Sequence, residues 1–132
     1  MANLVCDIVT PVAKLFSDEA SMVVVPGVEG EMGFLYGHVP LVSALSDGVV
    51  RVQSGQGEAQ RFALQGGYVE VTGEKVIILA DRAVPVSEIK ADEVRAELAE
   101  LEAKLASLSE EEAKLTTLAS DIAWCNVQLA AA

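Results

Sequence analysis

The sequence predicts an N-terminal antiparallel β-sandwich followed by a C-terminal antiparallel hairpin of two helices. All ten glycines lie at or before Gly73, and the last of the four prolines is Pro85. Before that point short apolar runs alternate with turn residues, whereas after it leucines recur every three or four residues. We therefore expect residues 1–86 to form the β-sandwich and residues 87–132 to form the helical hairpin.

The strands are predicted from short runs of apolar and β-branched residues. The segment 4–9 alternates between two faces, and further runs lie at 22–25, 49–52, 62–64, 68–71 and 76–79. Turn-forming pairs such as Asp47-Gly48, Gly66-Gly67 and Thr72-Gly73 separate these runs. Short runs with frequent turns are typical of an antiparallel sandwich. Several runs are apolar on both faces, which favours two stacked sheets over one open sheet.

The helices are predicted from two apolar stripes. The first stripe comprises Val94, Leu98, Leu101, Leu105 and Leu108, and the second comprises Leu115, Leu118, Ile122, Cys125 and Leu129. Steps of three and four residues place each stripe on one face of a helix. Ser109 and Glu112 have the spacing of a capping box, which predicts a second helix from Glu110 to Ala132. A hairpin is favoured if the stripes face each other, and an extended helix if a partner covers both.

Composition and charge restrict the classes of function. The chain has 132 residues and a formal net charge of −11, which argues against nucleic acid because its phosphates would be repelled. No apolar run approaches the ~18 residues that a membrane-spanning helix needs, so we expect no direct insertion into a membrane. Cys6 and Cys125 lie far apart without metal-ligand spacing, which indicates two reduced, partly buried thiols in a cytoplasmic protein.

The segment 26–41 is the most unusual part of the sequence. It holds four glycines, two prolines, two carboxylates and the only histidine. His38 near Glu29 and Glu31 raises the question of a metal site or an acid–base pair. A metal site needs three or four ligands, and no further histidine exists to supply one. We therefore expect no catalytic residue and no metal site, with a small enzyme that uses His38 and Glu31 as an alternative.

The same segment resembles the signature of the epsilon subunit of F-type ATP synthase. The shared pattern is proline-glycine, glutamate-glycine-glutamate, glycine, glycine-histidine and proline-leucine, and every element stands here in order between Pro26 and Leu41. The likeness continues through Gly66–Val71 and Val76–Asp81. It implies a sandwich of about ten strands and a C-terminal helical hairpin that also exists in an extended form.

The resemblance also implies a function and a set of partners. The chain would be a non-catalytic subunit of the central stalk of a proton-translocating ATP synthase, coupling rotation of the membrane ring to ATP synthesis. Glu29, Gly30 and Glu31 would face the ring of c subunits, and His38 would lie near the gamma subunit of the central shaft. If extended, the C-terminal helices would reach the catalytic hexamer. The subunit would be peripheral, at the cytoplasmic face of the bacterial cell membrane.

The start of the first helix is similar to the nucleotide-binding motif of this family. Asp92 would accept from an adenine amine or a ribose hydroxyl, and Arg95 would neutralise phosphate. The alternative is an ion pair between these two residues at i, i+3 spacing. Ala91 is small for covering a base, and Lys114 is the only base in the second predicted helix. We expect weak or absent binding of ATP as a regulatory ligand, and no other cofactor.

The helical part is acidic, with ten acidic and four basic residues from Glu88 onward. In relatives, an extended basic helix blocks hydrolysis by reaching acidic surfaces, so we expect weaker inhibition by this chain. A structural alternative is a homodimeric scaffold in which the two apolar stripes form a coiled coil between chains.

Overall fold

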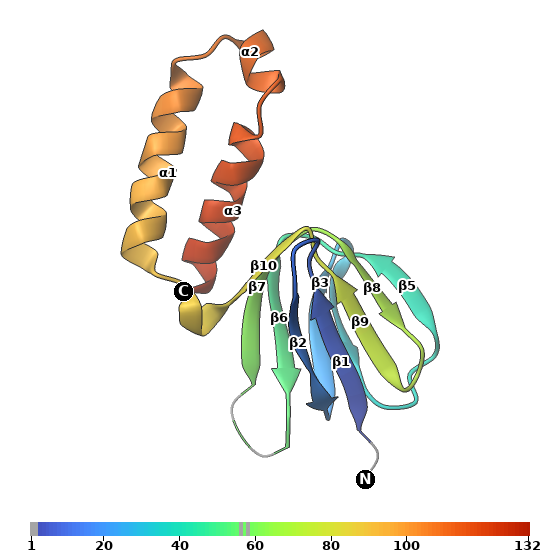
Figure 1. Ribbon diagram of the computed structural model, residues 1–132. Coiled ribbons are helices and arrows are strands. Elements are labelled where there is room, and N and C mark those ends of the chain that lie inside the picture. Colours follow the sequence, from blue (N-terminus) through green and yellow to red (C-terminus); the bar gives the residue numbers. More distant parts are fainter. Residues whose placement is uncertain (1–2, 56, 58) are drawn as a thin grey trace.

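A β-sandwich and a helical hairpin make up the computed structural model, which describes residues 3–55, 57 and 59–132 (Figure 1). The described strands form two five-stranded sheets, ordered β2-β1-β9-β8-β5 (sheet 1) and β10-β7-β6-β3-β4 (sheet 2). Their bounds are β1 Leu4–Val9, β2 Lys14–Ala20, β3 Met22–Gly27, β4 Gly30–Phe34, β5 Leu41–Ala44, β6 Gly48–Gln53, β7 Gln60–Gln65, β8 Tyr68–Val71, β9 Lys75–Leu79 and β10 Arg82–Pro85. The predicted ten-stranded sandwich is therefore confirmed.

One strand pair differs from the antiparallel prediction. β1 runs parallel to β9, in register from Val5 opposite Lys75 to Val9 opposite Leu79, whereas the other neighbouring strands are antiparallel. The pair joins the first strand to the ninth across most of the domain. Strand direction in such a long-range pair leaves no mark on local residue patterns, so the sequence did not indicate it.

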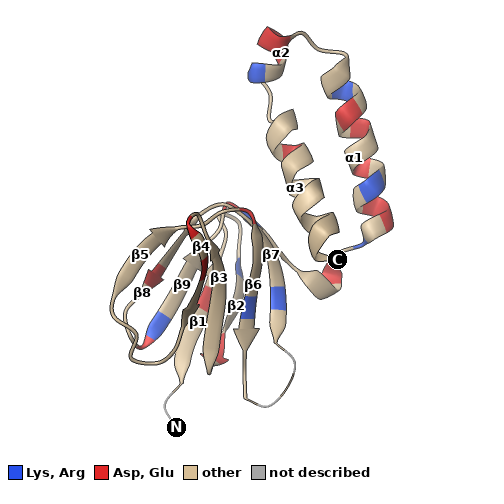
Figure 2. Cartoon of the chain, turned by 180° about the vertical axis from the view of Figure 1, so that it is seen from behind, with Lys and Arg blue, Asp and Glu red and all other residues tan. Residues whose placement is uncertain are grey.

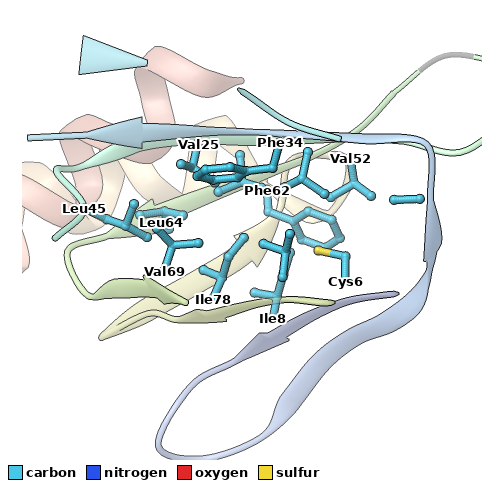
Figure 3. Close-up of a cluster of buried hydrophobic side chains, with 14 of the residues drawn as sticks. Cys6, Ile8, Val25, Phe34, Leu45, Val52, Phe62, Leu64, Val69 and Ile78 are labelled. Atoms are coloured by element: carbon cyan, nitrogen blue, oxygen red, sulfur yellow. The ribbon is translucent and has the colours of Figure 1, made fainter. Parts of the chain in front are cut away.

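The core lies between the two sheets. Figure 3 shows side chains from both layers pointing into this space, among them Phe34 and Val25 from sheet 2 and Ile8 and Ile78 from sheet 1. Burying a large apolar side chain of this kind stabilises a fold by ~1.5–3 kcal/mol. Gly67 turns the chain from sheet 2 to sheet 1 with a φ of +110°, and a Cβ there would lie 2.0 Å from the Leu79 carbonyl oxygen. Only glycine fits this crossing.

The helical region contains three helices, α1 (Ala91–Ala106), α2 (Glu110–Lys114) and α3 (Leu118–Ala131), after a short 3₁₀ turn η1 (Val86–Glu88). The predicted capping box is confirmed: Ser109 Oγ accepts from the Glu112 amide at 3.2 Å, and the Ser109 amide donates to Glu112 Oε1 at 3.3 Å. The members of the first stripe, together with Ala91, are the buried or half-buried positions of the first helix and its end.

The prediction of an unbroken second helix from Glu110 to Ala132 was wrong. The chain leaves helical geometry between Lys114 and Leu118, and Leu115 is 88% exposed, so it does not belong to the second stripe. Thr116 explains the break, because its hydroxyl competes with helical hydrogen bonds. Thr116 Oγ1 donates to the Ala113 carbonyl oxygen at 2.9 Å and accepts from the Leu118 amide at 3.3 Å.

The helical hairpin contacts the sandwich through α3. This helix packs against α1 on one side and against β7 and β6 of sheet 2 on the other. Arg82 pairs with Asp121, Gln65 Nε2 donates to the Ser120 carbonyl oxygen at 2.9 Å, and Arg61 Nη2 donates to the Ala131 carbonyl oxygen at 3.1 Å. Residues 62–65 of β7 are all buried because the core covers one face and α3 the other. Double-sided apolar character thus marks helix docking as well as sheet stacking.

The two thiols are free and buried, as the sequence predicts. Burial, reinforced by the neighbouring Asp7 charge, raises the pKa of the Cys6 thiol to about 12. Burial also raises the pKa of Cys125, which lies on α3. Because the thiolate is the reactive form, burial and a raised pKa both slow the reaction of these thiols in the folded protein. Within the described residues, no helix has the length and apolar character that crossing a membrane requires.

Candidate functional site

The first part of the glycine-rich segment, residues 26–34, belongs to a paired β-hairpin. β3 and β4 pair from Val23 opposite Phe34 to Gly27 opposite Gly30, so that only Val28 and Glu29 form the turn. Gly30 has a φ of +129°, which an L side chain rarely adopts. The Val28 amide also donates to the Ala44 carbonyl oxygen at 3.3 Å, which ties the turn to β5. The turn is therefore held in place at one end of the sandwich.

The two carboxylates of this hairpin have different surroundings. Glu29 lies exposed in the turn, whereas Glu31 lies on β4 and its Oε2 is 3.4 Å from Arg51 Nη1 of β6. Both partners of this pair are about half exposed, so the pair contributes little to stability. A groove of about 440 Å³ separates the hairpin from β5, and its lining includes both carboxylates, Met32 and Val42.

His38 lies at the opposite end of the sandwich from Glu29. It follows the far end of β4, and Gly37 beside it donates to the Gly73 carbonyl oxygen at 2.6 Å, in the turn between β8 and β9. The ring of His38 is half-buried, stands edge-on to Phe34 with centroids 5.0 Å apart, and places Nδ1 2.7 Å from the Val39 carbonyl oxygen. β4 alone spans ~13 Å at the usual rise per residue. The structure therefore does not bring His38 and Glu31 together as an acid–base pair.

No group of three histidine, cysteine or acidic side chains within the described residues has the geometry to hold a metal ion. The expectation of no metal site remains a prediction. What the segment 26–41 does provide is an exposed acidic turn and, at the other end, a half-buried histidine.

The outer face of sheet 1 is a second surface, which the sequence analysis missed. Val42, Tyr68 and Leu79 on this face are 68%, 59% and 49% exposed, and helix contacts lie on sheet 2 instead. Figure 1 shows the helices on the side of β7 and β10, away from β5 and β8. The sequence held a signal for this surface, because β5, β8 and β9 carry apolar residues at both odd and even positions, and these positions point to opposite faces of the sheet.

One ion pair is set into this apolar face. Asp7 on β1 is 5% exposed, and its carboxylate accepts from Ser17 Oγ at 2.6 Å and pairs with Lys75 Nζ at 3.0 Å. These contacts, with the Ser17 hydrogen bond contributing most, lower the pKa of Asp7 against the effect of its burial. Asp7 is thus held in its ionised form, and the charge of Lys75 balances it within the sheet.

The predicted nucleotide residues pair with each other. Arg95 Nη2 lies 2.6 Å from Asp92 Oδ1, and both side chains are exposed, at 60% and 97%. The neighbouring hollow of about 300 Å³ is lined by Glu88, Glu93 and Glu97 as well as Lys90, so its charge is unfavourable for phosphate. Weak or absent ATP binding stays a prediction, and the geometry is that of the ion-pair alternative.

Comparison with known proteins gives a consistent picture. Residues 3–86 match the family described as ATP synthase, Delta/Epsilon chain, beta-sandwich domain. The ATP synthase epsilon chain of Granulibacter bethesdensis is 40% identical over 107 residues, which cover 81% of this chain and 79% of the relative. The sodium ion specific ATP synthase epsilon chain of Propionigenium modestum is 37% identical, with 74% and 70% covered.

Among solved structures, a chain of the Euglena gracilis mitochondrial ATP synthase, in an OSCP/F1/c-ring assembly, has the same fold. Its TM-score is 0.69 at 24% sequence identity, and the match covers 98% of this chain and 76% of that chain. The matched region includes both the sandwich and the helical hairpin.

Proposed function

Because this chain belongs to the epsilon-chain family of ATP synthase and is a non-catalytic subunit of that complex, we propose that it couples rotation of the membrane ring to ATP synthesis. It does so from the rotating central stalk, bound to the gamma shaft subunit and to the ring of c subunits, at the cytoplasmic face of a bacterial membrane. The observation that carries the proposal is the exposed acidic turn held rigidly at one end of a sandwich.

The acidic turn is suited to the ring contact. Glu29 in the turn and Glu31 beside it on β4 project from a paired hairpin, so little backbone freedom is lost when they bind basic side chains. Charges at a rim contribute only ~0–1 kcal/mol each to affinity, but they fix orientation and suppress wrong partners. The coupling ion is proposed to be the proton, although a relative of this chain is described as sodium ion specific.

The outer face of sheet 1 is suited to the shaft contact. Its exposed apolar side chains, Val42, Tyr68 and Leu79, are of the aromatic and aliphatic kinds that form the centre of an interface. His38 lies at the edge of this face, beside the turn between β8 and β9. A subunit with ring and shaft contacts at separate places transmits torque through the rigid sandwich between them.

The experiment uses ATP synthase from which this subunit has been removed and to which variants are returned. We expect Glu29→Lys combined with Glu31→Lys to lower proton-driven ATP synthesis several-fold, because reversed charges repel a basic ring surface. Asp18→Lys is the matched control, since Asp18 is exposed on the edge strand β2, toward the other end of the sandwich. Synthesis at the wild-type rate with the double variant bound would refute the proposed ring contact.

The helical hairpin is proposed to inhibit hydrolysis weakly and to reach the catalytic hexamer only if it extends. The charges of α1 are mostly acidic, and Asp121 is the only charged residue of α3 (Figure 2). Such helices are not attracted to acidic surfaces. Deletion of residues 88–132 should therefore change ATP hydrolysis by the assembled enzyme only slightly, and a large rise would contradict this.

The alternative of a homodimeric coiled coil is not supported. α1 and α3 pack against each other within one chain, and their apolar stripes meet there. Sedimentation of the isolated chain should accordingly give a monomer. A tight dimer that is lost on deleting residues 94–129 would revive the scaffold interpretation.

A further inference from the structure

A row of four side chains crosses the outer face of sheet 1 near its middle. Val42 of β5 lies opposite Glu70 of β8, Glu70 lies opposite Ile77 of β9, and Ile77 lies opposite Asp7 of β1. Cross-strand neighbours on one face are in side-chain contact range. The row therefore places two carboxylates among apolar groups, with their Cα atoms ~10 Å apart across two strand spacings.

The two carboxylates of the row differ in how their charge is balanced. Asp7 is buried, and Lys75 and Ser17 satisfy its oxygens. Glu70 is exposed, and it forms no ion pair or side-chain hydrogen bond with any described residue. The row therefore has one unbalanced charge, and that charge stands between Val42 and Ile77.

The charge of Glu70 lies among apolar side chains, and it therefore determines which partner surfaces can bind there. A surface that covers Val42, Tyr68 and Leu79 also removes water from the carboxylate between them. A carboxylate that loses water without gaining a partner is strongly disfavoured. We propose that the partner surface that covers sheet 1 is apolar and carries one lysine or arginine side chain, which binds Glu70. This inference rests on the proposed docking of sheet 1 onto the central shaft.

Glu70 is then a specificity-determining residue of the interface. Apolar contact alone would accept many apolar surfaces, whereas a carboxylate at the centre rejects any surface without a matching base. Asp7 makes no such demand, because Lys75 already neutralises it. The face thus selects a partner that carries a single positive charge opposite Glu70 of β8.

The test measures the affinity of the full chain for ATP synthase that lacks this subunit. We expect Glu70→Gln to weaken binding about 10- to 100-fold, because the partner's base is left buried and unpaired. We expect Glu70→Lys to weaken it further, since two like charges then meet. If no base faces Glu70, the Gln variant removes an unpaired buried charge and binds more tightly. Unchanged or tighter binding of Glu70→Gln would overturn the inference.

Two controls separate this inference from the proposed function. Val42→Ser should weaken binding, because the partner covers Val42. Asp18→Asn should leave binding unchanged, because Asp18 lies on the edge strand β2 opposite the core residue Cys6, so its side chain is not on the outer face. Failure of the wild-type chain to bind would contradict the proposed function itself. Weaker binding of Val42→Ser beside unchanged binding of Glu70→Gln would contradict only the matching base.

Discussion

The sandwich and the helical hairpin are stabilised by different amounts of buried surface. Among the residues that the structure describes, seventeen buried ones form one continuous cluster between the two sheets. In the helical region only Val94, Cys125 and Ala131 are buried. The sandwich is therefore a rigid support for the two proposed binding surfaces. The helical hairpin is joined to it along one seam, formed by the contacts of α3 with β6 and β7 and by the pair Arg82–Asp121.

The two long helices also differ from each other. α1 carries many charges on its exposed faces, whereas Asp121 of α3 is paired with Arg82 of β10 (Figure 2). This pair is partly buried, with side-chain exposures of 35% for Arg82 and 26% for Asp121. The only charge of α3 is thus used to attach the helix to the sandwich, which makes the seam sensitive to one side chain.

The loss of unfolding free energy should differ most between the two regions when an apolar side chain is truncated. Phe34→Ala removes a fully buried ring from the sandwich and should cost ~3–5 kcal/mol of unfolding free energy. Leu101→Ala removes a half-buried side chain from α1 and should cost clearly less. Urea unfolding monitored by circular dichroism compares the two. Equal losses would show that the regions form a single cooperative core.

An intermediate effect is expected at the seam. Asp121→Asn keeps the shape of the side chain but weakens the bond to Arg82, and should destabilise docking of α3 by ~1–2 kcal/mol after allowance for partial exposure. Hydrogen exchange should then rise in α3 while β9 amides stay protected. If β9 loses protection to the same extent, the seam supports the whole molecule rather than the hairpin alone.

The same pair predicts how docking depends on pH. The hydrogen bond from Arg82, and to a smaller extent that from Thr117, lowers the pKa of Asp121 despite partial burial. A lowered folded-state pKa stabilises the protein above the unfolded value of 3.8, and this stability is lost as pH falls through the folded value. Fluorescence of Trp124, the only tryptophan, should therefore be constant near neutrality and change below about pH 4.

Asp121→Asn provides the control for this pH dependence. The variant should lack the acid-induced change that Asp121 causes, because its amide does not titrate in this range. Asp7 of sheet 1 also has a lowered pKa and destabilises the sandwich at low pH. An identical fluorescence change in the variant would assign the transition to the sandwich, and thereby contradict separate attachment of α3.

The smallest effect is expected at the start of α1. Arg95→Ala removes an exposed i, i+3 pair with Asp92 and should change stability by only a few tenths of a kcal/mol. Calorimetric titration should find ATP affinity weaker than about 1 mM Kd in the wild-type chain and unchanged in the variant. Tight ATP binding that Arg95→Ala abolishes would show that the pair opens to form a nucleotide site.

Strands with strong apolar runs were predictable from sequence, and weaker ones were not. β1, β3, β6, β8 and β9 follow the predicted runs closely. β2, with the sequence KLFSDEA, is an edge strand with polar residues, and β4 contains two glycines, so neither has a strand signal of its own. Their pairing depends on neighbours supplied by distant parts of the chain. Local residue patterns contain no record of those neighbours.

The candidate surfaces divide in the same way. The acidic turn was predictable because glycines and carboxylates are concentrated in one segment, around Glu29 and Glu31. The outer face of sheet 1 was not, since Val42, Tyr68 and Leu79 are distant in sequence and meet only through strand order. The break before Leu118 was missed because threonine hydroxyls can either tolerate a helix or end it, and tertiary contacts of α3 decide between the two.

The most direct test of torque transfer through two separate contacts is labelling of introduced cysteines, which the burial of both native thiols permits. Single variants Glu29→Cys and Val42→Cys are exposed to a thiol reagent in the isolated chain and in the assembled ATP synthase. Ser54→Cys, at the end of the sandwich opposite Glu29, is the control. We predict that assembly slows labelling at positions 29 and 42 at least tenfold but leaves position 54 unchanged. Equal rates at position 29 in the free and assembled states would contradict the account.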